Sequence, residues 1–249
     1  FNDYLRKFGK TGKVDLTLEA YVHIGNAYQK KKDEASAQKA FTTSYTAFTK
    51  LSDAEKQALT TGLTAVAEAR FEMGEAIRRE FDAVKLKIHP YQNVKKFIEE
   101  MAKVIAKKSD LISKARAVYL EVIEFRSANW AIAALTRIGE MFQQLANDIY
   151  DAPAPGSFDE EQVETYKGSM AERAQPVEGK AVEAYVTAVK KAQELRWFNE
   201  YSDKAAKELA RLSPKEYRYD GEVRSKPEFF GSPTFRQPYI STLPAQEEQ

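Results

Sequence analysis

The fold is decided by the stretch Tyr21-Val-His-Ile-Gly-Asn-Ala-Tyr28, which is followed by Ala37-Gln-Lys-Ala-Phe41 and Ser44. In the first run, three apolar or aromatic side chains recur at steps of three and four residues: Tyr21, Ile24 and Tyr28. They therefore share one face of a predicted helix over about 15–31, for which Asp15 is the expected N-cap.

A second helix, predicted over about 34–50, carries a matching face made of Ala37, Phe41 and Ser44. We expect Gly25 to lie opposite Ala37, because two small residues let helices approach closely while aromatic side chains fill the space around them. A pair of helices this short cannot bury both of its faces alone. The pattern therefore predicts neighbouring helix pairs of the same kind.

The step from an apolar residue to glycine recurs at Gly74 and Gly139, which are 65 residues apart. In the first unit, 12 positions separate the glycine from the small residue of the second helix. Ala115 follows Gly74 by 41 positions and Ala181 follows Gly139 by 42, so these units carry 29 and 30 extra residues. We predict an internal duplication in which two helix hairpins are lengthened into long arms.

The remaining helix boundaries follow from capping and breaking residues. Ser52 and Glu55 have the spacing of a capping box and predict a helix that runs unbroken to His89-Pro90. Further helices are predicted over about 92–125, from about 127 to a Pro/Gly-rich loop at 151–159, from about 159 to 195 with a kink at Pro176, and over about 197–213.

Composition limits the classes of function. The chain has 249 residues, 43% of them hydrophobic, and its 38 basic and 37 acidic residues give a formal charge of +1. This balance does not favour a nucleic-acid surface or a basic membrane anchor. There is no cysteine, and no apolar run approaches the length of a membrane span. Because Phe1 is the first residue, we expect the chain to be part of a longer or processed product.

We divide the chain into a lead-in segment (1–14), a helical domain (15–213) and an extended tail (214–249). The tail contains four prolines after residue 220 and is rich in aromatic residues, a composition that favours extended conformations. Its candidate binding residues are Phe229, Phe230, Phe235 and Tyr239. Two interpretations stay open: a strap on the chain's own helices, or an arm that docks on a partner.

Residues 18–213 resemble the tetratricopeptide-repeat (TPR) superfamily. The runs Ala69-Arg-Phe-Glu-Met-Gly-Glu75, Ala134-Leu-Thr-Arg-Ile-Gly-Glu140 and Phe198-Asn-Glu-Tyr201 are similar to those of large TPR proteins of deltaproteobacteria such as myxobacteria. Several members of that group are exported envelope proteins, and some belong to gliding-motility or secretion machinery. The resemblance implies a TPR-like α-solenoid and a non-catalytic scaffold in the periplasm or cell envelope, while a cytoplasmic location stays open.

TPR geometry also implies a binding surface, because the first helix of each unit lines the concave side. The residues predicted to face outward there and bind a partner are Asn26, Gln29, Glu75, Arg78, Glu140 and Gln143; Glu19, Glu68 and Thr136 belong to the same face. This mixture is polar and somewhat acidic, which favours a polar or basic extended ligand. An ordinary solvated surface is the alternative.

The sequence contains little that predicts catalysis. His23 and His89 are the only histidines, they lie in different units, and no cysteine accompanies them. We therefore expect neither a metal site nor a cofactor. The carboxylate pairs, such as Glu99-Glu100, and the lysine pairs interleaved with glutamates are interpreted as solvated helix faces, so we expect no nucleic-acid binding.

Together these observations predict a non-enzymatic scaffold within a hetero-oligomeric complex. It would bind protein partners through its concave helix faces and its tail. The alternative hypothesis is a peptide- or substrate-binding module that presents cargo to a partner enzyme. An enzyme is the third and least favoured hypothesis.

Overall fold

The structure is a computed structural model that describes residues 1–9, 11–85 and 93–219. In these residues the chain forms nine α-helices and no β-strand, which confirms the all-α prediction. The chain divides into a helical unit over 1–218 and a second unit over 219–249. Only Tyr219 of the second unit is described, so the predicted tail beyond it lies outside the described residues.

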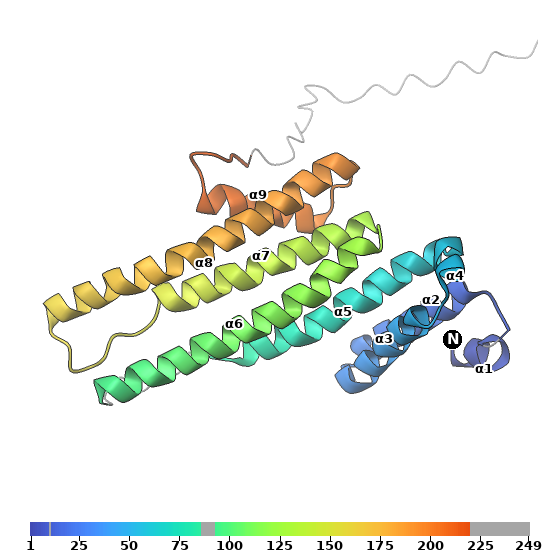
Figure 1. Ribbon diagram of the computed structural model, residues 1–249, viewed down its shortest axis with the longest axis horizontal. Helices are drawn as coiled ribbons and strands as arrows, with labels where there is room; N and C mark the ends of the chain where they lie inside the picture. Colours follow the sequence, from blue (N-terminus) through green and yellow to red (C-terminus); the bar gives the residue numbers. More distant parts are fainter. Residues whose placement is uncertain (10, 86–92, 220–249) are drawn as a thin grey trace, which may run out of the picture. The chain divides into compact units, whose positions relative to one another are not determined.

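Figure 1 shows the order of the helices along the chain. Their bounds are α1 (Asn2–Phe8), α2 (Val14–Lys30), α3 (Glu34–Thr49), α4 (Asp53–Ala58), α5 (Thr61–Ala83), α6 (Val94–Glu124), α7 (Ala128–Tyr150), α8 (Glu160–Leu195) and α9 (Glu200–Leu212). The short helix α1 lies within the predicted lead-in segment. Pro176 lies inside α8 without ending it.

Three pairs of consecutive helices form antiparallel hairpins: α2 with α3, α5 with α6, and α7 with α8 (Figure 1). The helices have 17 and 16 residues in the first hairpin, 23 and 31 in the second, and 23 and 36 in the third. These lengths agree with the predicted extension of the second and third units. The last helix, α9, packs against both α7 and α8.

One contact recurs at the same place in each hairpin, where a glycine of the first helix meets an aromatic ring of the second. The pairs are Gly25 with Phe41, Gly74 with Tyr119, and Gly139 with Tyr185. A Cβ atom added at Gly74 or Gly139 would lie 2.5 or 2.6 Å from the Cε1 atom of the facing tyrosine. All three rings are fully buried, so only a residue without a side chain fits opposite them.

The prediction that Gly25 lies opposite Ala37 is therefore wrong. The nearest atoms to a Cβ at Gly25 all belong to Phe41, which lies one helical turn after Ala37. Ala37, Ala115 and Ala181 are nevertheless fully buried, and each lies four residues before its hairpin's ring. The repeat predicted from the glycines thus extends to the second helix of each hairpin.

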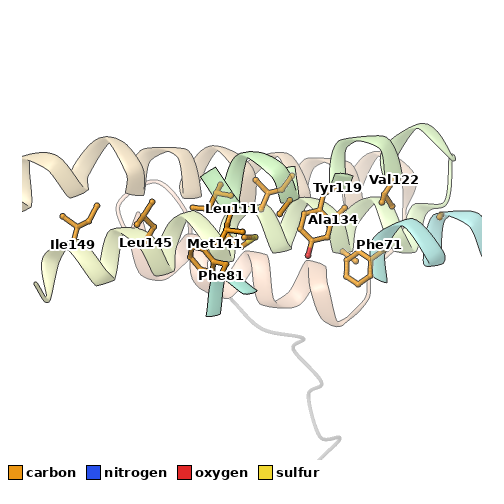
Figure 2. Packing of buried hydrophobic residues seen from close by; sticks show 14 of the residues in the cluster. Phe71, Phe81, Leu111, Tyr119, Val122, Ala134, Met141, Leu145 and Ile149 are labelled. Carbon is orange, nitrogen blue, oxygen red and sulfur yellow. The ribbon is translucent and has the colours of Figure 1, made fainter. Parts of the chain in front are cut away.

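The main core lies between the second and third hairpins (Figure 2). The ring of Phe71 on α5 packs against Tyr119 on α6 and Trp130 on α7, with ring centres 5.6 and 5.0 Å apart. Further along the same helices, Leu145 and Ile149 continue the apolar contact (Figure 2). The long helices are therefore joined by one continuous core.

Asp15 does not cap its own helix as predicted, because α2 begins at Val14 with Lys13 in the N-cap position. Its Oδ1 atom instead accepts hydrogen bonds from the backbone N–H groups of Thr60 (2.8 Å) and Gly62 (2.7 Å) at the start of α5. Partial burial alone would raise the pKa of Asp15, but these hydrogen bonds outweigh it and lower the pKa. Asp15 thus caps a helix of the neighbouring hairpin.

The helix predicted to run unbroken from Ser52 is in fact interrupted. Ser52 and Glu55 form the expected capping box, in which the Ser52 backbone N–H donates to the Glu55 carboxylate at 2.8 Å. Helix α4 ends at Ala58 because Leu59 adopts an extended backbone and buries its side chain. The cap that Asp15 supplies then starts α5 as a separate helix.

Lys108 on α6 is only 2% exposed. Its ammonium group forms an ion pair with Asp148 on α7 and lies 4.4 Å from the centre of the Phe81 ring on α5. The Asp148 side chain is 31% exposed, so water still solvates that end of the pair. Lys108 therefore joins three helices mainly through its buried aliphatic chain.

Replacing the buried glycines should test the ring contact. We expect Gly74→Ala and Gly139→Ala each to lower the free energy of unfolding by about 1–3 kcal/mol, because the new methyl group overlaps a buried ring. Gly168 and Gly179 on α8 have no atom within 4 Å of an added Cβ, so the same substitution there should raise stability by about 0.5–1 kcal/mol. Urea unfolding measures all four variants. Equal effects at the two kinds of site would contradict the ring contact.

For Lys108, two substitutions separate packing from charge. Lys108→Ala should lower the free energy of unfolding by about 2–4 kcal/mol through the cavity it leaves. Lys108→Met keeps most of the buried chain and leaves a partly solvated Asp148, so it should cost less than about 1.5 kcal/mol. If thermal and urea unfolding rank the two variants the other way, the ion pair rather than the packing stabilises this site.

Candidate partner-binding surface

The six residues predicted for partner binding on the helices lie one and four positions after the three hairpin glycines. They are Asn26 and Gln29 on α2, Glu75 and Arg78 on α5, and Glu140 and Gln143 on α7. The structure brings them to the places where the first helices of successive units meet. In these places most of them contact side chains of the first helix of the next unit. We call this set of contacts between first helices the polar ladder.

Between α2 and α5, the ladder consists of two amide–carboxylate hydrogen bonds. Asn26 Nδ2 donates to Glu68 Oε1 at 2.7 Å, and Gln29 Nε2 donates to Glu72 Oε2. An amide satisfies the hydrogen-bonding capacity of a carboxylate oxygen but brings no positive charge. Negative charge therefore remains on this part of the surface.

Glu72 shows the effect of that remaining charge. Burial raises the pKa of Glu72, and the nearby carboxylates of Glu75 and Glu68 raise it further. The hydrogen bond from Gln29 and the charge of Arg79 act in the opposite direction, but the pKa stays above its ordinary value. The ionised form of Glu72 is thus incompletely solvated and incompletely neutralised.

Between α5 and α7, an ion pair replaces the amide contacts. Glu75 Oε1 lies 3.1 Å from Arg137 Nε and also receives a hydrogen bond of 2.6 Å from the Tyr119 hydroxyl. Arg78 Nε lies 3.2 Å from the same oxygen. Glu75 therefore connects the ring that packs on Gly74 to the next hairpin.

Two side-chain contacts also join α7 to α9. Glu140 forms an ion pair with Lys204, and Gln143 Nε2 donates to Glu208 Oε2 at 2.6 Å. The Tyr185 hydroxyl donates to the Oε1 atom of the same Gln143. As at Tyr119, the tyrosine that fills the space beside the glycine also holds a member of the ladder.

The ladder has a repeating register. On α5, the partners Glu68 and Glu72 lie six and two residues before Gly74, and on α9 the partners Lys204 and Glu208 lie six and two residues before Ala210. Ala210 thus occupies on α9 the position that glycine occupies on α2, α5 and α7. By this register, α9 is the first helix of a fourth unit.

The expectation that this whole face points outward is wrong for two residues. Glu75 is 8% exposed, and Thr136 is fully buried, where its hydroxyl donates to the Ile132 and Tyr201 carbonyl oxygens. The structure shows a shared, partly buried polar surface in place of separate solvent-facing side chains. Partner binding by the predicted residues stays a prediction, and the tail residues Phe229, Phe230, Phe235 and Tyr239 lie outside the described residues.

A second surface, which sequence reasoning missed, lies between the second helices. Two adjoining hollows of about 580 and 500 Å³ follow α6 and α8, over residues 98–120 and 161–187, and we call them together the α6–α8 groove. The signal in the sequence was a second apolar stripe on α6. Its members are Ile98, Ala102, Ile105 and Leu120, which are exposed or half-buried.

The described residues give few groups suited to other chemistry. Among them, no group of three or more histidine, aspartate or glutamate side chains is placed to hold a metal ion. His23 is exposed and stacks on the ring of Phe1 at 4.8 Å. His89 lies outside the described residues. Of the helices described, none has the length and apolar character needed to cross a membrane.

Comparisons with known proteins add no relative: no protein-family model matches the chain, and neither a curated protein nor a solved structure matches it. The relationship to TPR proteins therefore stays a resemblance in the sequence.

Glu72 yields a prediction about stability and pH. The pKa of Glu72 is higher in the folded state than in the unfolded state. Below the unfolded-state pKa the carboxyl group is protonated in both states and does not affect the free energy of unfolding. As pH rises through the folded-state pKa, the buried group ionises and the folded protein loses stability. Glu72→Gln keeps an acceptor for Gln29 and removes the charge. We expect a higher urea midpoint for the variant at about pH 7 and equal midpoints at about pH 4. Exposed Glu164 on α8 supplies the control Glu164→Gln, and a gain of the same size there would exclude this explanation.

Proposed function

We propose that the protein is a non-catalytic, TPR-like helical scaffold, and that the face of its first helices binds a basic, extended segment of a protein partner. The observation that carries the proposal is the pair of carboxylates on α5, Glu68 and Glu72, which are held by the uncharged amides of Asn26 and Gln29. A lysine or arginine from a partner would supply the missing positive charge and restore the solvation of Glu72.

The polar ladder supports this function in a second way. It joins the first helices of all the units by side-chain contacts. These contacts orient the carboxylates before any ligand arrives, so binding loses less conformational entropy. A scaffold needs such a surface, whereas an enzyme needs groups positioned for proton transfer or nucleophilic attack.

Charge reversal at Glu75 or Glu140 is a poor test, since both residues hold hairpins together. Glu72→Gln is better because stability and binding should change in opposite directions. A labelled peptide of alternating lysine and serine is the probe, with a glutamate–serine peptide as its counterpart. We expect Glu72→Gln to stabilise the fold at about pH 7 and to weaken the lysine peptide about tenfold, the loss of one charge-assisted contact.

Fluorescence anisotropy at low ionic strength measures these affinities, and Glu164→Gln serves again as the control. Equal binding of the two peptides by the unmodified protein would contradict the proposal. So would unchanged affinity of the lysine peptide for the Glu72→Gln variant.

The proposed setting is a hetero-oligomeric assembly at the bacterial cell envelope, and its support is the sequence resemblance described above. Fractionation of native cells tests the location. Recovery of the protein in the cytoplasmic fraction alone would contradict it.

A further inference from the structure

We propose that the α6–α8 groove binds an amphipathic helix of a partner protein, with an apolar stripe flanked by acidic residues. This would be a second docking surface, built from second helices and independent of the basic segment proposed for the first-helix face. The protein would then connect two different partners.

The arrangement of α6, α7 and α8 leaves room for a fourth helix. Both α6 and α8 pack along α7, whereas the backbones of α6 and α8 stay apart along nearly all of their length. Their side chains form two walls, and Leu135, Ile138, Phe142 and Leu145 of α7 form the floor of the larger hollow. These four residues follow helical spacing, so the floor is a straight apolar stripe. A helix laid on it would complete a bundle of four helices.

The two hollows lie one after the other along the same pair of helices and together define a path. The smaller hollow extends to Ile105 and Arg173, and the larger one begins about one turn later, at Ser109 and Val177. From residue 98 to residue 120 of α6, the path is about 33 Å long at about 1.5 Å per residue. An occupant helix of about six turns would fill it.

Apolar side chains in the groove are exposed where a helix would lie. Ile98 is 50% exposed and Leu120 is 39% exposed, and they stand near opposite ends of the path. Near Ile98, the Tyr166 hydroxyl of α8 donates to the Met101 sulfur of α6 at 3.3 Å. Burial of such surface would supply the affinity, at about 25 cal/mol per Å².

The charged residues that line the groove indicate which kind of partner helix it would bind. Arg116 on α6 and Lys180 on α8 stand on opposite walls of the larger hollow, and Arg173 lines the smaller one. Within the described residues, neither arginine has a hydrogen bond or ion pair, and Lys180 only lies over the Phe142 ring at 5.7 Å. The groove also contains Glu161 and Glu183, so its cations outnumber its acids by three to two. Acidic residues that flank the middle of the partner helix's apolar stripe would lie close to these three cations.

The probe for the test is a synthetic helix of about 22 residues with leucines at steps of three and four and glutamates beside them. Its counterpart carries lysines in place of the glutamates. We expect the acidic helix to bind the whole protein with a micromolar Kd by fluorescence anisotropy and the lysine helix to bind at least about tenfold more weakly. The double variant Arg116→Glu/Lys180→Glu should reverse that order.

Apolar recognition is tested separately. Leu120→Ser should weaken binding of the acidic helix by about fivefold or more. Leu195→Ser changes a leucine that is 45% exposed and lies outside the groove, so the affinity for the acidic helix should stay unchanged. Lys190→Glu on α8 is the charge control. Circular dichroism and thermal unfolding establish that each variant is folded.

Three results would overturn the proposal: equal binding of the two helices, failure of the double variant to change their order, or equal losses at Leu120 and Leu195. Glu72→Gln should not affect the acidic helix, and the groove variants should not affect the lysine–serine peptide. The groove proposal and the first-helix proposal can therefore fail separately.

Discussion

The packing of an aromatic ring onto a bare glycine is the contact on which the other features depend. It sets the distance between the two helices of each hairpin at Gly25–Phe41, Gly74–Tyr119 and Gly139–Tyr185. In the second and third hairpins, the hydroxyl of the same tyrosine reaches a polar side chain, Glu75 or Gln143, that contacts the next unit. One residue thus fixes both the packing within a hairpin and the spacing between hairpins.

This dependence explains how much of the fold was predictable from the sequence. Residues that act within one hairpin leave a local pattern, so the all-α class, the helix pairs and the two lengthened hairpins followed from the spacing of glycine and alanine. Contacts between hairpins leave no such local pattern in the sequence. Asp15 looks like the N-cap of α2, but its hydrogen bonds go to Thr60 and Gly62, 45 and 47 residues away. The break between α4 and α5 was missed for the same reason.

The candidate surfaces show the same limit. The register after each glycine predicts that Asn26, Gln29, Glu140 and Gln143 share one face of the first helices. It could not show that these residues contact the next helix, because a partner such as Glu68 is 42 residues from Asn26. The α6–α8 groove depends on how far α7 holds its two neighbours apart. That distance is a property of three helices together, and the apolar stripe on α6 alone does not reveal it.

Ala210 has a consequence for how such a chain can evolve. By the register of the polar ladder, it stands on α9 where the earlier first helices have glycine. A single copied second helix that packed its phenylalanine or tyrosine ring there, as α3, α6 and α8 do on the earlier glycines, would meet the Ala210 methyl group. A copy of a whole hairpin, by contrast, would bring its own glycine opposite its own ring. The unit that can be copied in such an array is therefore the hairpin and not the single helix.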